Sequence, residues 1–171
     1  MKKGFFIILF CLLLSACSSE KSSIPQDFIA ELNSTDLSSE QVGGVQLGES
    51  EQQLKEKRGL PDGEFDVKMN GKDEYDDPFR ALEYSDAGYT IRNDKVVSYN
   101  LHKNSATVGG VKLGDSSDSV KDIYGEEFYN RGYKDIEALG YIDKENEWVI
   151  EFIITAGKVT GILMGELSMF E

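Results

Sequence analysis

Alternating apolar and polar positions predict three β-strands in each half of the chain. The predicted strands cover residues 79–84, 88–92, 96–101, 133–141, 147–155 and 158–164. Such alternation is typical of a strand with one face on a core and the other toward water. The strand at 147–155 differs, because part of it is apolar on both faces. We therefore expect it to lie centrally or to carry a covered patch on its second face.

A repeated stretch places a short helix ahead of the strands in each half. It reads VGGVQLGES at residues 42–50 and VGGVKLGDS at residues 108–116. Ser50 and Ser116 stand where a helix N-cap is expected, because a serine hydroxyl can accept the free N–H groups of a first turn. Gly59 and Gly125 would end the two helices, since glycine readily adopts a left-handed conformation. Helices of about two turns are not stable alone, so each needs a sheet to cover.

The repeat predicts an α+β protein built from two tandem modules at residues 41–104 and 105–171. Each module would be a short helix, or helix pair, packed on an antiparallel sheet of three to four strands. The two sheets would be continuous or paired, with the helices on one face. Residues 25–40 carry Phe28, Ile29 and Leu32 on one side of a possible first turn. They predict a short helix or an arm.

The first residues have the pattern of a targeting segment. Residues 1–16 combine a positive start with an apolar run that is too short to span a bilayer as a helix. The run ends in Leu-Ser-Ala-Cys, which resembles the lipobox of bacterial lipoproteins. The resemblance implies that Cys17 is diacylated and becomes the first mature residue, on the extracytoplasmic face of the cell membrane. Residues 17–24 would then be a flexible tether. An ordinary secretory signal or an uncleaved anchor is the alternative.

Charge argues against one class of partner. The chain has 18 Lys and Arg against 31 Asp and Glu, a formal net charge of -13. Removal of Lys2 and Lys3 with the signal peptide would bring the mature chain to -13 - 2 = -15. Because phosphate binding needs clustered basic side chains, we do not expect a nucleic-acid partner.

The sequence offers little for catalysis and suggests no cofactor. His102 is the sole histidine, and Cys11 leaves with the signal peptide, so a nucleophile with its base or a zinc ligand set is not expected. We therefore predict a protein that is not an enzyme. Two acidic stretches are either solvated loops or weak Ca²⁺ sites, since hard oxygen ligands suit that ion. Their candidate ligands are Asp73, Asp76, Asp77, Asp143 and Glu145.

The order of a Leu-Gly-acid-Ser stretch, a short helix, a glycine, a strand and a hairpin resembles the modules of SmpA/OmlA-type outer-membrane assembly lipoproteins. The tandem form is similar to β-lactamase inhibitory proteins. Many lipoproteins of Gram-positive bacteria are also similar to this chain. The resemblance implies a non-enzymatic sheet with an exposed face that holds a partner protein. Aromatic residues of the strands are candidate anchors, or else core beneath the helices. They are Tyr84, Tyr89, Tyr99, Tyr141, Trp148 and Phe152.

These observations favour a lipid-anchored module that regulates or inhibits a cell-envelope protein, in a Gram-positive host. One alternative is a lipoprotein that binds a small ligand, Ca²⁺ or a cell-wall fragment between the modules. Others are an exclusion or immunity lipoprotein of a mobile element, and a structural role in the envelope.

The lipobox makes a direct prediction. Intact mass measurement of the protein from host membranes should give a chain that begins at Cys17 and carries diacylglycerol, because the thiol is the acylated group. A Cys17→Ser variant should lose that mass increment and its membrane attachment. An unmodified thiol at position 17 would contradict the assignment.

Overall fold

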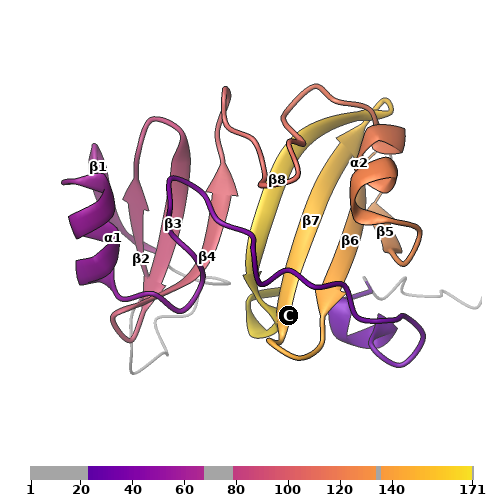
Figure 1. Ribbon diagram of the computed structural model, residues 1–171, viewed down its shortest axis with the longest axis horizontal. Coiled ribbons are helices and arrows are strands. Elements are labelled where there is room, and N and C mark those ends of the chain that lie inside the picture. Colours follow the sequence, from indigo (N-terminus) through magenta and orange to yellow (C-terminus); the bar gives the residue numbers. More distant parts are fainter. Residues whose placement is uncertain (1–22, 68–78, 134–135, 171) are drawn as a thin grey trace, which may run out of the picture.

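The computed structural model describes residues 23–67, 79–133 and 136–170. Within these ranges, eight strands form one antiparallel sheet in the order β1-β2-β3-β4-β8-β7-β6-β5. The strands are β1 (Gly63–Val67), β2 (Phe79–Glu83), β3 (Ala87–Arg92), β4 (Lys95–Leu101), β5 (Tyr129–Tyr133), β6 (Ile136–Asp143), β7 (Trp148–Thr155) and β8 (Lys158–Glu166). The long central strands β7 and β8 stand side by side in Figure 1.

The predicted fold class, α+β with two tandem modules, is wrong. The described residues form a largely β fold, with one sheet and two α-helices of eight residues each. The two halves share the sheet because β4 pairs with β8, with Ser98 opposite Gly165 and Asn100 opposite Leu163. Alternation along a sequence locates strands but carries no information on which strands pair. Of the two arrangements expected for the strands, continuous or paired, the β4–β8 pairing selects one continuous sheet.

The edge strands β1 and β5 were not predicted. The predicted strand at 133–141 is divided, because β5 ends at Tyr133 and β6 begins at Ile136. β1 reads GEFDV and β5 reads YNRGY, and neither shows a clear apolar face. Each pairs with one neighbour, β2 or β6. Pairing with that neighbour therefore extends the sheet beyond what the apolar pattern indicates.

The two predicted helices are present with the expected caps. In α1 (Glu51–Arg58), the Ser50 hydroxyl accepts the Gln53 N–H at 3.2 Å and the Gln53 side chain accepts the Ser50 N–H at 2.9 Å. In α2 (Ser117–Tyr124), the Ser116 hydroxyl accepts the Ser119 N–H at 3.2 Å. The glycines after both helices have positive φ, 79° and 92°. That conformation is cheap only for glycine and ends each helix.

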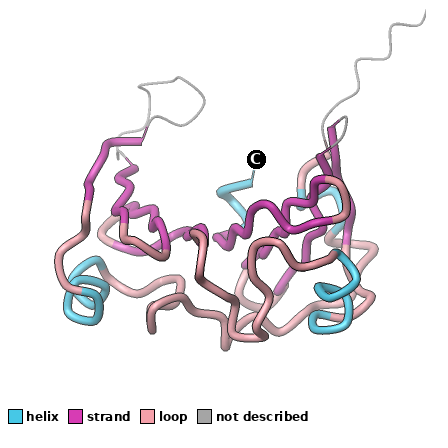
Figure 2. Tube along the Cα trace, turned by 90° about the horizontal axis from the view of Figure 1, so that it is seen from above, coloured by secondary structure: helices cyan, strands magenta, loops and turns pink. Residues whose placement is uncertain are grey.

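The repeated stretches contact the sheet in the same way. The Gly48 N–H donates to the Val96 carbonyl at 2.8 Å, and the Gly114 N–H donates to the Val159 carbonyl at 2.8 Å. Each repeat thus docks on the first residues of the strand that closes its half, β4 or β8. Both helices are therefore placed on the same face of the sheet, as Figure 2 shows.

The two faces of the sheet differ in their cover. α1, α2 and the segment that leads to α1 lie on one face, and that segment crosses the sheet between the helices (Figure 1). We call the opposite face, which carries Thr90, Ser98, Asn100, Glu151 and Leu163, the open face. Two short 3-10 turns, η1 (Pro25–Phe28) and η3 (Leu167–Phe170), cover one end of it. The C-terminal turn stands on that side in Figure 2.

The segment at 25–40 joins the two faces. Phe28, Ile29 and Leu32 pack on the open-face cluster, whereas Leu37 is fully buried on the helix side. The backbone N–H of Thr35 donates to the Ile142 carbonyl at 2.8 Å on the way round the sheet. Among the described residues, no helix is long and apolar enough to cross a bilayer.

The caps can be tested in pairs. Ser50→Ala and Ser116→Ala should each lower the free energy of unfolding by about 1 kcal/mol, because an N–H of the first turn loses its acceptor. Ser50→Ala should cost more, since it also disturbs the reciprocal Gln53 bond. Urea denaturation measures both, with the exposed Gln52→Ala as control. Equal stability of all four proteins would show that the caps do not hold the helices.

Candidate functional site

The structure places the predicted aromatic anchors on the helix-covered face. Tyr84, Tyr89, Tyr99, Tyr141 and Phe152 are at most 6% exposed, and Trp148 is partly buried against them. Two of their hydroxyls donate to the carbonyls that end the helices, Tyr84 to Gly59 at 3.0 Å and Tyr141 to Gly125 at 2.9 Å. Side chains with so little exposed area offer no contact surface to a partner. In this structure they fill the core and fasten the helices.

The acidic candidates do not form a metal site in the described part of the chain. Asp73, Asp76 and Asp77, like Cys17, lie outside it. Asp143 is buried, and its carboxylate accepts N–H groups of Leu37, Glu145 and Asn146 at 2.9–3.1 Å. It therefore fastens the β6–β7 turn to the N-terminal segment. No cluster of three or more His, Cys, Asp or Glu side chains that could hold a metal occurs among the described residues.

His102 has structural contacts only. Its Nδ1 lies 3.1 Å from the Tyr84 carbonyl and its Nε2 lies 3.3 Å from the Glu83 carboxylate. Neither of these two contacts of the ring is with a hydroxyl group.

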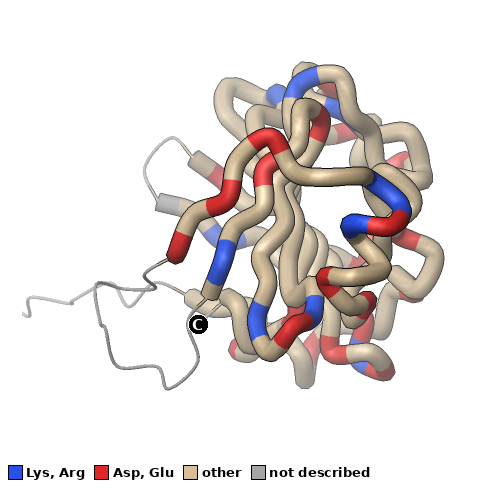
Figure 3. The backbone as a smooth tube through the Cα atoms, turned by 90° about the vertical axis from the view of Figure 1, so that its left-hand side faces the viewer, with Lys and Arg blue, Asp and Glu red and all other residues tan. Residues whose placement is uncertain are grey.

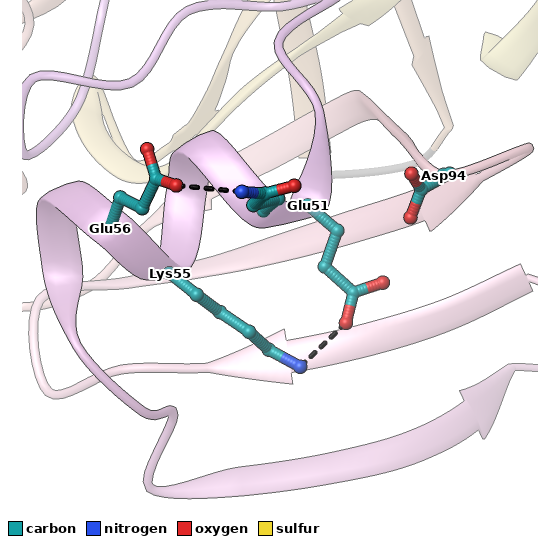
Figure 4. Close-up of a pocket in the computed structure, with 5 residues that line it drawn as sticks. Glu51, Lys55, Glu56 and Asp94 are labelled. Atoms are coloured by element: carbon teal, nitrogen blue, oxygen red, sulfur yellow. Dashed lines mark hydrogen bonds and ion pairs between the residues drawn. The ribbon is translucent and has the colours of Figure 1, made fainter.

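A hollow of about 530 Å³ lies beside α1. Two of its charged residues, Glu51 and Lys55, already have partners within the fold. Figure 4 shows Glu51 reaching the Lys55 ammonium, at 2.6 Å. Glu51 is also paired with Arg80. Burial raises the pKa of Glu51, yet the hydrogen bonds from Lys55 and Arg80 outweigh it and hold the pKa below its usual value. The Glu51 carboxylate thus links α1 to Arg80 on β2.

A second cavity of about 530 Å³ lies on the open face. Its lining includes Thr90, Ser98, Asn100, Leu163 and Met169. The register explains the hollow, because small residues meet across the strands. Ser98 stands between Thr90 on β3 and Gly165 on β8. Because these neighbouring side chains are short, they leave the space above the backbone of the sheet unfilled.

One wall of the cavity is a buried charge network. The Glu151 carboxylate is 2% exposed and accepts hydrogen bonds from Tyr129 Oη at 2.6 Å, Arg131 Nε at 2.7 Å and Arg131 Nη2 at 2.9 Å. The Glu151 bonds raise the pKa of Arg131. Burial, and then the charge of Glu151, raise the pKa of Tyr129, so its hydroxyl keeps the proton that it donates. The two charged groups of this wall, Arg131 and Glu151, are paired, so its net charge is close to zero.

Gly140 makes room for this network. A Cβ atom at Gly140 would lie 2.1 Å from Cζ of Tyr129, so the ring rests directly on the backbone of β6. Any larger residue would push the Tyr129 hydroxyl away from Glu151.

The opposite wall comes from the C-terminal turn. Met169 and Phe170 of η3 line the cavity, and Phe170 lies over Gly165, where a Cβ would be 3.2 Å from its ring. The turn is fixed by the Leu167 N–H, which donates to the Glu147 carbonyl at 2.7 Å. The Gln26 amide donates to the Leu167 carbonyl at 2.8 Å. The cavity is therefore lined by aliphatic and aromatic groups beside a paired ion network.

Three exposed apolar side chains lie on the open face. Phe65 is 58% exposed, Ile136 is 52% exposed and Leu163 is 39% exposed. Register puts all three on the open face, because Phe65 pairs through Ala81 with Thr90 and Ile136 pairs with Thr155 on β7. The open face thus carries exposed apolar side chains on β1, β6 and β8, with a hollow near its centre. On the α1 side of the molecule neither sign of charge forms a separate patch, since Figure 3 shows acidic and basic residues intermixed there.

Sequence reasoning expected a sheet with an exposed face but missed the residues that line its cavity. Asn100, Leu163 and Arg131 give no motif, and only neighbours in space give them a shared role. One signal was present. Glu151 is an acidic residue inside a strand that is otherwise apolar on both faces, which indicates a buried partner for its charge.

No protein-family model and no curated protein sequence matches the chain. Solved structures with loose similarity include an extracellular SCP-domain protein of Bacillus anthracis str. Ames, with 9% identity, TM-score 0.46, and 70% of this chain and 44% of that chain covered. A cysteine-rich secretory protein of Staphylococcus aureus gives 12% identity, TM-score 0.46, and 72% and 45% coverage. This chain therefore spans less than half of both proteins.

A third similar structure is of comparable length. It is described as a "putative beta-lactamase inhibitor protein" of Streptococcus mutans, with 16% identity, TM-score 0.30, and 86% of this chain and 99% of that chain covered. At these identities and TM-scores, none of the three likenesses carries a function to this chain.

The charge network can be tested by breaking it. Arg131→Met should lower the free energy of unfolding by about 2–3 kcal/mol, because Glu151 stays buried without its cation. The double variant Arg131→Met/Glu151→Gln should recover part of the loss, since Tyr129 can still donate to the amide oxygen. The control is Lys57→Met, whose pair with Glu49 is exposed on the Lys57 side and should be worth about 1 kcal/mol or less. A loss in Arg131→Met no larger than in the control would show that the pair is not coupled to folding.

Proposed function

We propose that this chain is a lipid-anchored, extracytoplasmic binding domain that holds a partner protein on its open face. The observation that carries the proposal is the open-face hollow, whose lining includes Ser98 and Leu163. Sheet faces of folded proteins are ordinarily covered, and an exposed apolar patch with a polar rim is typical of an interaction site. The extracytoplasmic location rests on the lipobox at Cys17.

The cavity suits one apolar side chain of a partner. Ile153, Leu163 and Phe170 supply apolar contact, and Glu151 requires no further counter-ion because Arg131 already pairs with it. Thr90, Ser98 and Asn100 add hydrogen-bonding groups at the same hollow. A buried apolar anchor inside a polar rim is the arrangement in which a few residues supply most of the binding energy. Binding of this kind would regulate or inhibit an envelope protein without catalysis.

A small ligand is the second candidate for the same cavity. Its volume of about 530 Å³ lies within the range of about 300–1,000 Å³ that small-molecule pockets occupy. Soluble cell-wall fragments that raised the melting temperature in proportion to their occupancy would favour this candidate.

The protein-binding proposal predicts contact from one face. A photo-crosslinking residue placed at Asn100 or Leu163 in the host should yield an adduct of one defined mass. The same residue at Asp122, which is exposed on α2 on the other face, should not. Adducts of equal yield from both faces, or from Asp122 alone, would contradict docking on the open face.

A charge introduced at the centre of the surface should abolish the adduct. Leu163→Asp places an unpaired carboxylate where the partner's apolar group would rest, and desolvating it costs more than the contact returns. The adduct from Asn100 should fall at least about tenfold, which corresponds to 1.4 kcal/mol. Leu163 is already partly exposed, so the melting temperature should change little. Asp122→Arg serves as the charge-change control and should leave the adduct unchanged.

A further inference from the structure

The chain enters the fold beside the open-face cavity. The carbonyl of Ser23, the first described residue, accepts a hydrogen bond from Arg131 Nη1 at 3.3 Å. Arg131 belongs to the cavity wall. Shortly after this entry, Phe28 stacks on Tyr129 with ring centroids 4.9 Å apart and planes 8° apart. The entry point is therefore fixed at the β5 edge of the sheet.

Covalent length limits how far this edge can lie from an acylated Cys17. Five residues lie between Cys17 and Ser23, so six Cα–Cα steps join the two positions. An extended chain spans at most about 3.6 Å per residue, so the two positions are no more than roughly 22 Å apart. The limit holds for every conformation of the intervening residues.

The two ends of the sheet differ in how far they can lie from Cys17. Strands lie about 4.8 Å apart, so the eight strands place β1 roughly 34 Å from β5. α1 contacts the sheet at the β1 end, through the pair of Glu51 with Arg80. The α1 end can therefore stand well clear of the bilayer, whereas the β5 end cannot.

We infer that the β5 side of the open-face cavity is held near the membrane and that its partner presents the docking segment there. The occupant would be an extracytoplasmic loop of an integral membrane protein, with an apolar residue at its tip. This inference rests on the proposed function. A loop at the same height gains effective concentration from the shared membrane, which a freely diffusing protein does not.

The geometry can be measured without any partner. The mature chain is coupled through Cys17 to a maleimide lipid in nanodiscs that contain a Gd³⁺-chelating lipid, and amide signals are recorded by NMR. Residues of η1 and β5 should lose signal several-fold more than residues of α1. A matched variant with twenty Gly and Ser residues inserted between Ser22 and Ser23 should show this difference reduced or gone. Equal loss at both ends without the insertion, or greater loss at α1, would overturn the inference.

The partner's location is tested separately, in the host. The Asn100 adduct of the proposed function should fall several-fold with the twenty-residue insertion and also in Cys17→Ser, because both separate the open face from the membrane. An adduct of unchanged yield in both variants would keep docking on the open face but overturn a membrane-resident partner. Absence of any open-face adduct would instead overturn the proposed function. An intact mass without acylation at Cys17 would overturn the inference directly.

Discussion

Pairing between β4 and β8 is the contact on which the architecture depends. Three residue pairs join the halves, Ser98 with Gly165, Tyr99 with Met164 and Asn100 with Leu163. On the helix side the Tyr99 hydroxyl donates to the Met164 sulfur at 2.9 Å. On the other side, Ser98 and Gly165 leave little side-chain volume at the same junction. One seam thus makes a continuous core on one face and a hollow on the opposite face.

The two faces are packed by opposite means. Under the helices, large tyrosines fill the space and their hydroxyls satisfy the carbonyls at the helix ends, as Tyr84 and Tyr141 do. On the open face, glycine and serine leave the space empty, and the short turn η3 covers only one end of it. Apolar groups such as Phe65 remain in water there at a free-energy cost. The partner that we propose would cover this exposed apolar area.

Much of the local structure could be predicted because its causes are local. Ser50 and Ser116 cap their helices through atoms three residues away, and the glycines that end the helices act through their own φ angles. Strands such as β4 were visible because their apolar residues alternate with polar ones along the sequence. The candidate site could not be predicted, since Arg131 and Glu151 are twenty residues apart and meet only through the β5–β6–β7 register. For the same reason the sequence left the aromatic residues as either anchors or core, because alternation does not say which face receives the helices.

The sequence by itself determined the caps, the repeat, six of the eight strands and the targeting pattern that ends at Cys17. Each of these is encoded within a few neighbouring residues. Only the tertiary structure decided that both halves share one sheet, that Tyr84, Tyr89, Tyr99 and Tyr141 are buried, and that the opposite face has a hollow. Those properties follow from backbone pairing between distant strands, where hydrogen bonds are nearly indifferent to side-chain identity. The choice of partner strand therefore leaves little trace in the sequence.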